Sequence, residues 1–237
     1  MSLSKLIIKW SKRRRNLGLV VDHQGHLVIL APQGTTPEAI GQALAKHQAW
    51  IAKKQGERRQ SLDRLKPGQV YLLGLAYNLH IRAGPAANVV LRNGAILVCL
   101  PETTGGFWPV LRQWYLRQAE YHLPVRVEHF QNLMHLIAGP VQVWEWQRRW
   151  GECRPGEGGR LRFNWRLILL PPEILDYVVV HELAHLKVAG HPPGFWQQVE
   201  AILPDYRRRR GWLNNYGLPF LRWTAEVPGN QERIDKL

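Results

Sequence analysis

The chain has 237 residues, of which 45% are hydrophobic, so it is not a disordered protein and has room for one large or two small domains. No stretch approaches the ~18 apolar residues that a membrane helix needs, and the N-terminal charges follow a short apolar stretch, the reverse of a secretory signal. We therefore expect a cytoplasmic protein. Two cysteines without a CxxC pair exclude a disulfide framework and a cysteine-only zinc site, and a single disulfide is not expected in the cytosol.

The net charge of +14 favours a polyanionic partner, either nucleic acid or an acidic protein surface. A solvated basic surface explains the same charge. The basic residues fall in short separate clusters, at Lys12–Arg15, Lys53–Lys54 with Arg58–Arg59, Arg148–Arg149 and Arg207–Arg210. Such clusters indicate nucleic acid less strongly than one continuous stripe, and no helix-turn-helix, zinc-finger or RNP motif accompanies them. Nucleic acid is therefore a possible partner, and a membrane is not.

The N-terminal segment predicts a hairpin followed by a helix. Apolar residues alternate in residues 16–31, and Asp22–Gly25 supplies the turn. Thr36 is a good N-cap and Pro37 suits the first helical position. The apolar residues that follow recur at helical spacing, so one face of this helix should pack.

Two further β segments follow Pro67–Gly68. Residues 69–82 predict a strand that is interrupted at Gly74. Residues 89–100 predict a hairpin, because Asn93–Gly94 stands between two alternating apolar runs and favours a type I′ turn. We therefore expect residues 1–104 to form a β-rich N-terminal subdomain with one helix.

Residues 105–237 are expected to form a second domain. A helix begins at about Trp108, Pro124 kinks or ends it, and a further helical stretch reaches about Leu136. Two strands and a helix follow, at residues 141–150, 160–169 and 172–188. From Trp212 on the sequence shows no strong period.

The predicted helix at 172–188 carries the sequence HELAHLKVAGH. His181 and His185 are four residues apart, so both imidazoles project from one side and can bind one Zn²⁺ at ~2.0–2.1 Å. Glu182 is rotated away from the metal, where it can accept a proton from a water molecule beside it. Gly190 allows the chain to turn back and bring His191 to the pair as third ligand. The spacing of the three histidines matches the metzincin motif, but that motif has its glycine two residues earlier, so this is not a metzincin.

These residues predict a monomeric zinc metalloprotease that hydrolyses peptide bonds with Glu182 as general base. The alternative is a helix whose histidines are partly exposed and bind no metal. It would require three of the ten histidines to fall at ligand spacing by chance. Two other functions stay open. One is a basic nucleic-acid-binding protein with a structural zinc, which would need four protein ligands and no base. The other is a zinc hydrolase of another amide.

Three stretches of the sequence resemble the YgjP-like, or WLM-type, zinc metallopeptidases. They are WGEC (150–153), FNWRLILLPPEILDYVVVHELAHL (163–186) and HPPGFW (191–196), and the resemblance extends from about residue 8 to about 214. It implies an α+β fold, with a zincin-like core around the HExxH helix. It also implies zinc ligation by His181, His185 and His191 and catalysis by Glu182. The family is related to SprT-like proteases, which leaves open a protease that acts on nucleic-acid-bound proteins.

The resemblance also covers residues around the predicted site that are not metal ligands. The family usually has serine where this chain has Glu152, and Cys153 is interpreted as a packed thiol because three histidines complete a catalytic set. The family motif at residues 164–166 either lines the HExxH helix or borders a substrate groove at a sheet edge. Candidates for stabilising the oxyanion are Tyr206, Arg166 and Tyr216.

Overall fold

A computed structural model of the chain describes residues 6–225, apart from residues 23, 64, 102 and 104. The chain divides into two compact units, Met1–Lys66 and Pro67–Leu237. Each unit is described by itself.

The first unit contains the predicted N-terminal hairpin. The unit has a three-stranded sheet of β1 (Leu6–Ser11), β2 (Gly18–Val21) and β3 (Leu27–Pro32), in the order β1-β3-β2. Strand β3 pairs antiparallel with β2, which confirms the hairpin, and parallel with β1. The side chain of Asp22 stabilises the turn by accepting hydrogen bonds from the backbone N–H groups of Gln24 and His26, both at 2.9 Å.

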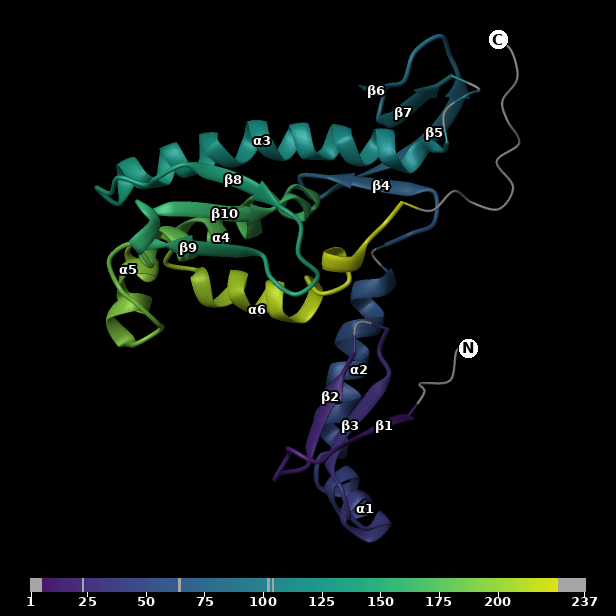
Figure 1. The fold of residues 1–237 in the computed structure, drawn as a ribbon, viewed down its shortest axis with the longest axis vertical. Coiled ribbons are helices and arrows are strands. Elements are labelled where there is room, and N and C mark those ends of the chain that lie inside the picture. Colours follow the sequence, from purple (N-terminus) through teal and green to yellow (C-terminus); the bar gives the residue numbers. More distant parts are fainter. Residues whose placement is uncertain (1–5, 23, 64, 102, 104, 226–237) are drawn as a thin grey trace. The chain divides into compact units, whose positions relative to one another are not determined.

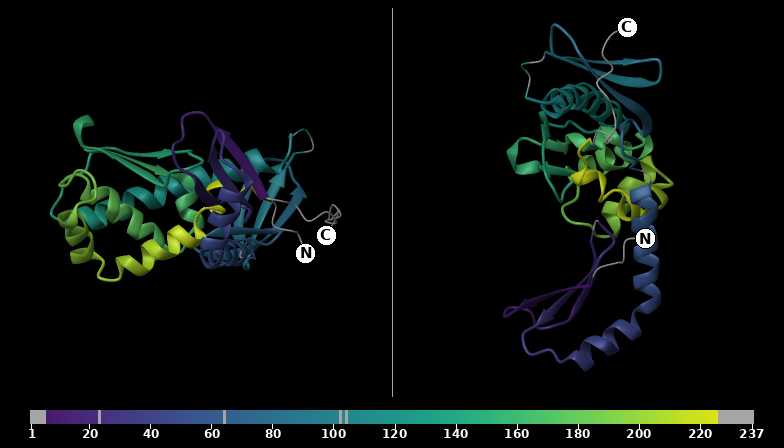
Figure 2. Two further views of the ribbon diagram at one scale, coloured as in Figure 1. Left: turned by 90° about the horizontal axis from the view of Figure 1, so that it is seen from below. Right: turned by 90° about the vertical axis from the view of Figure 1, so that its right-hand side faces the viewer.

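Two helices follow the hairpin where the sequence predicted one. Helix α1 (Pro37–Lys46) begins as expected, because the Thr36 side chain accepts a hydrogen bond from the Ala39 N–H at 3.3 Å. The chain bends at His47 before α2 (Gln48–Asp63), and Figure 2 shows the two as consecutive helices. Ile40 of α1 is buried with Ile29 and Ala31 of β3 in the core of this unit.

The second unit begins with two hairpins, of which the second was predicted, while the first replaces the single interrupted strand expected at residues 69–82. Strands β4 (Gln69–Leu72), β5 (Leu75–Ala83), β6 (Asn88–Arg92) and β7 (Ala95–Leu100) form a sheet in the order β4-β5-β7-β6. The interruption at Gly74 is a turn, with φ of 48° at Leu73 and 78° at Gly74. Asn93 and Gly94 have φ of 51° and 73°, as the predicted type I′ turn requires.

The division between the two units differs from the predicted domain boundary after residue 104. Buried hydrogen bonds join β4 to later parts of the chain: Tyr115 Oη donates to Tyr71 O at 2.8 Å, and the Leu73 N–H donates to Ile168 O at 2.6 Å. Gly74 also packs against Pro171, since a Cβ at this glycine would lie 2.8 Å from the proline Cα. The two hairpins therefore belong to the same compact unit as the predicted second domain.

Helix α3 (Phe107–Leu133) is continuous. Of the two predicted effects of Pro124, ending the helix is therefore wrong, and the further helical stretch expected after it belongs to the same helix. Pro124 lies on the exposed side of the helix. The opposite side is buried, through Leu111, Trp114, Tyr115, Ala119, Leu123, Val127 and Phe130. Burial of this face on both sides of the proline outweighs the loss of one backbone hydrogen bond.

A second sheet contains β8 (Val141–Trp144), β9 (Gly151–Arg154) and β10 (Arg160–Asn164), in the order β8-β10-β9. Strand β10 is parallel to β8 and antiparallel to β9, so β9 lies at an edge. Both predicted strands are shorter than expected. After Asn164 the chain enters a 3₁₀ helix, η2 (Trp165–Leu169), because the Asn164 side chain accepts the Arg166 N–H at 3.1 Å.

The remaining helices are α4 (Pro172–Ala184), α5 (Pro193–Ile202) and α6 (Tyr206–Tyr216), with short 3₁₀ turns at Pro155–Glu157 and Phe220–Arg222. Helix α4 starts as predicted and ends at His185, its C-cap, while α5 and α6 were not predicted. Helix α4 packs against α3, α5, α6 and β9 (Figure 1). The fold is therefore of the expected mixed α+β class.

The structure also bears on the predictions about the cysteines and about membrane helices. Cys99 and Cys153 are both free thiols. Among the described residues, no helix is both long and apolar enough to cross a membrane. The expected cytoplasmic location and monomeric state stay predictions.

Candidate metal centre

Helix α4 is an apolar helix that carries a polar cluster at its C-terminal end. Pro172 at its start and Glu173 in its first turn favour helix initiation. Most of its side chains are buried, namely Ile174, Leu175, Tyr177, Val178, Val179, Val180, Leu183 and Ala184. The packing of these residues holds the backbone of His181 and Glu182 in place.

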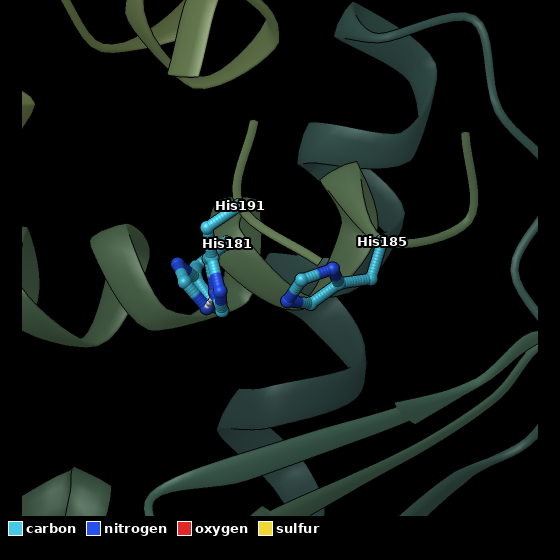
Figure 3. A group of neighbouring side chains, drawn as sticks. All are labelled: His181, His185 and His191. Carbon is cyan, nitrogen blue, oxygen red and sulfur yellow. Dashed lines mark hydrogen bonds between the residues drawn. The ribbon is translucent and has the colours of Figure 1, made fainter. Parts of the chain in front are cut away.

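Three histidines converge at this end of α4 (Figure 3). The Nε2 atoms of His181 and His191 are 3.1 Å apart, and one ring nitrogen from each of His181, His185 and His191 lies within 4.8 Å of the others. Gly190 has a φ of 69°, which allows the reversal that returns His191 to the helix. Nδ1 of His185 lies 3.1 Å from Val188 O, so Nδ1 donates a hydrogen bond to this carbonyl oxygen and Nε2 is the ring nitrogen left to bind a metal. The structure thus brings together the three predicted ligands.

Two of the histidines, His181 and His191, have a lowered pKa, which favours the neutral form that a metal requires. Burial, and then the charges of His185, His191 and Arg210, lower the pKa of His181 to about 3. Burial, followed by the charges of His185 and Arg210, also lowers the pKa of His191. Two nitrogens at 2.0–2.1 Å from a tetrahedral ion are separated by about 3.3 Å, close to the observed 3.1 Å. Donor type, protonation and spacing therefore all fit a metal ion.

Glu182 lies beside this cluster and is almost fully buried, with 7% of its surface exposed. Burial raises the pKa of Glu182 to about 8, although a hydrogen bond from the backbone N–H of Cys153 opposes this rise. Strand β9 runs directly against the carboxylate: a Cβ at Gly151 would lie 2.7 Å from both Oε1 and Cγ of Glu182. The WGEC stretch therefore orients the carboxylate, through the missing side chain of Gly151 and the N–H of Cys153.

The side chains of Cys153 and Glu152 have separate roles. Burial, and then the charge of Glu182, raise the pKa of the Cys153 thiol to about 12, so it is protonated at neutral pH, in keeping with a packed thiol. Glu152 instead forms ion pairs with Arg149, Arg154 and Arg162. These pairs, with the Arg154 hydrogen bond foremost, lower the pKa of Glu152. Glu152 thus belongs to an ion-pair cluster.

A cavity of about 490 Å³ opens over the histidines. Residues of β9, α4, α5 and α6 line it, with Trp150 just before β9 and His191 just before α5. They include Gly151, Tyr177, His181, Glu182, Trp196, Arg210 and Asn214. None of the three residues considered for oxyanion stabilisation is among the described residues that line it. The sequence indicated Gly151 only as part of the WGEC stretch and Arg210 only as part of a basic cluster, and it did not indicate Asn214.

The motif at residues 164–166 makes buried hydrogen bonds and an ion pair with residues 145–149. Asn164 is fully buried, and its amide donates hydrogen bonds to Trp146 O at 2.7 Å and Arg149 O at 3.0 Å. Arg166 pairs with Glu145 at 2.9 Å and lies 4.4 Å from the ring centroid of Trp165. These contacts favour the interpretation that the motif is structural, because none of its residues lines the cavity.

Three histidines at ligand spacing, beside a buried carboxylate and an open cavity, define a candidate metal centre of the kind found in metal-dependent enzymes. The family model for the YgjP-like metallopeptidase domain matches residues 15–216, so the chain belongs to the YgjP-like metallopeptidases. This confirms the resemblance predicted from the sequence. Membership supports a peptidase function that depends on a metal ion and acts on a protein or peptide substrate.

Among solved structures, the chain is similar to the crystal structure of the metallopeptidase zymogen of Pyrococcus abyssi abylysin. The identity is 19%, the match covers 45% of this chain and 99% of that chain, and the TM-score is 0.35. A likeness of this size carries no argument about the site. No curated protein matches the chain.

Proposed function

We propose that this protein is a zinc-dependent peptidase with a zincin-like core, in which Glu182 is the general base. The observation that carries the proposal is the convergence of three histidine nitrogens within 4.8 Å of one another, beside a cavity that His181, His191 and Glu182 line. His181, His185 and His191 would hold the ion. Imidazole is a preferred ligand of Zn²⁺, and three protein ligands leave a position for water or substrate.

The chain's own residues can move the proton that hydrolysis requires. Zn²⁺ in such a site lowers the pKa of water to about 7 and polarises the scissile carbonyl. Glu182 accepts a proton from the attacking water and passes it to the leaving amine. Its burial raises the affinity of the carboxylate for that proton, and the N–H of Cys153 and the close approach of Gly151 hold it in one orientation.

The alternative of a structural zinc is less well supported by these residues. A structural site takes four protein ligands, whereas the histidine cluster in the described part of the chain contains three. The thiol of Cys153 is half-buried and protonated rather than ionised. A structural site would also have no use for a buried carboxylate beside its ligands.

The experiment compares wild-type protein with Glu182→Gln, each measured for metal content and then for digestion of a peptide library. We expect one Zn²⁺ per chain in both, and a loss of turnover of about 10²- to 10⁴-fold in the variant, the usual contribution of a general base. Glu173→Gln is the matched control, since it removes the same charge from the first turn of the same helix. Full activity of Glu182→Gln would eliminate the proposed base, and another metal at the site would eliminate zinc.

A second candidate function, proteolysis of nucleic-acid-bound proteins, is favoured by one observation. Residues 1–66 contain 13 of the 32 basic residues but only four of the 18 acidic residues, so this segment carries a net charge of +9. Such a concentration of charge suits a polyanion. Binding of the full chain to DNA should weaken steeply as the salt concentration rises, and absence of binding at low salt would argue against this function.

A further inference from the structure

Helix α6 carries four consecutive arginines, and the last differs from the others. Arg207 pairs with Glu200 at 2.9 Å, while Arg208 and Arg209 pair with Asp205 at 2.6 and 2.7 Å. Arg210 forms no ion pair with a carboxylate in the part of the chain that the structure describes. The positive charge of the run is therefore left uncompensated at its fourth residue.

Arg210 is also the one of the four that lines the cavity of the metal centre. Its guanidinium lies 4.3 Å from the ring centroid of Trp196. Trp196 in turn stacks on His191, at 5.6 Å and 24°, and on Tyr206, at 5.4 Å and 14°. A stack of planar groups thus connects the guanidinium of Arg210 to His191. This packing limits the conformational freedom of the Arg210 side chain.

A guanidinium in this position can bind an anionic group of a ligand. When one face of the guanidinium rests on an aromatic ring, its N–H groups stay available at the edge, and they match the two oxygens of a carboxylate. Asn214 lies one helical turn beyond Arg210 and lines the same cavity, where its side-chain amide adds a further donor. Arg210 and Asn214 thus line the same cavity as His181 and His191.

We propose that Arg210, assisted by Asn214, is a carboxylate-binding subsite that selects peptides with an acidic group close to the scissile bond. The group is either the side chain of an acidic residue or the terminal carboxylate of the substrate. This inference rests on the proposed peptidase function and names its substrate class. Arg210 is thereby a specificity-determining residue.

Cleavage of paired peptides tests the subsite. Zinc-loaded protein is assayed with fluorogenic peptides that carry Glu or Gln at each position around the cleaved bond, and with free or amidated C-termini, which separates the two sources of the carboxylate. A charge-assisted hydrogen bond contributes about 1.5–3 kcal/mol, so kcat/KM should be about 10- to 100-fold higher for the carboxylate form. Arg210→Gln should remove this preference, and Arg210→Glu should replace it with a preference for Lys.

Arg208→Gln is the matched control. It removes the same charge from the same helix, but Arg208 does not line the cavity, so the preference should persist. A preference that survives in Arg210→Gln, or its absence in the wild type, would overturn the subsite. So would an equal fall in kcat for all peptides, because that result would indicate a general role in turnover.

A binding measurement separates the subsite from the proposed chemistry. Zinc-loaded Glu182→Gln is titrated with fluorescein-labelled Glu and Gln peptides, with and without Arg210→Gln, and fluorescence anisotropy gives the affinities. Tighter binding of the Glu peptide that depends on Arg210 supports the subsite, and equal binding overturns it. If the wild type cleaves no peptide, the peptidase proposal fails while the anisotropy still decides the subsite.

Discussion

Gly151→Ala should impair catalysis without removing the metal ligands. The added Cβ would lie 2.7 Å from Cγ and Oε1 of Glu182 and 2.9 Å from its Cδ, about 0.7 Å short of the 3.4 Å at which ordinary contact begins. Gly151 is not among the residues with positive φ, so alanine fits the backbone and the clash with Glu182 is the main perturbation. The carboxylate, buried against strand β9, must move to make room.

Two magnitudes follow from this displacement. Overpacking of a closely packed interior costs about 1–3 kcal/mol, which should appear as a lower urea midpoint. A catalytic group that moves by about 1 Å loses about 10²-fold in turnover. Metal content should stay unchanged, because the three atoms nearest to the added Cβ all belong to Glu182 and none belongs to a histidine. We would measure zinc content, peptide turnover and urea unfolding of the same preparation.

Gly156→Ala is the matched control, since no atom lies within 4 Å of a Cβ at that position. It should leave both turnover and stability close to wild type. If Gly151→Ala retained full turnover with its zinc, the close approach of β9 would not orient Glu182, and the assigned function of the WGEC stretch would be refuted.

Two further predictions concern the support of the site. Asn164→Ala leaves the buried carbonyls of Trp146 and Arg149 without their donor and should lower the free energy of unfolding by about 2–3 kcal/mol, so an unchanged urea midpoint would contradict this role. Burial raises the pKa of Glu145, but hydrogen bonds from arginines including Arg166 outweigh it and hold that pKa below 4.5. Because the folded-state pKa is depressed, the stabilisation is present above pH 4.5 and is lost as the pH falls through the folded value. Glu145→Gln should therefore lower the free energy of unfolding by about 2 kcal/mol at neutral pH. This is less than for a fully buried ion pair, because Glu145 is partly exposed. In urea unfolding at low pH, the difference between wild type and variant should be smaller.

The convergence of the histidines could be predicted from the sequence because it depends on local geometry. The i, i+4 spacing places His181 and His185 on one side of a helix, and a single glycine with positive φ returns His191 within six residues. The type I′ turn at Asn93–Gly94 and the N-cap of α1 were predictable for the same reason. In each case, residues adjacent in sequence determine the backbone conformation.

Local rules failed where burial decided the outcome. Pro124 was expected to kink or end the helix, but α3 continues through it because apolar residues on both sides are buried. Similarly, the predicted boundary after residue 104 did not anticipate the buried hydrogen bonds of Tyr71 and Leu73, whose partners lie 44 or more residues away.

The surroundings of the metal centre were decided by tertiary structure alone. Gly151 meets Glu182 across 31 positions of sequence, and Arg210 reaches the same cavity from a helix whose pattern predicted nothing. Neither position has a periodicity or spacing that links it to the histidines. The sequence by itself therefore determined which side chains could bind a metal, because helical geometry is local. Only the packing of β9, α4, α5 and α6 decided what surrounds them, because the burial of one side chain against another depends on residues distant in the chain.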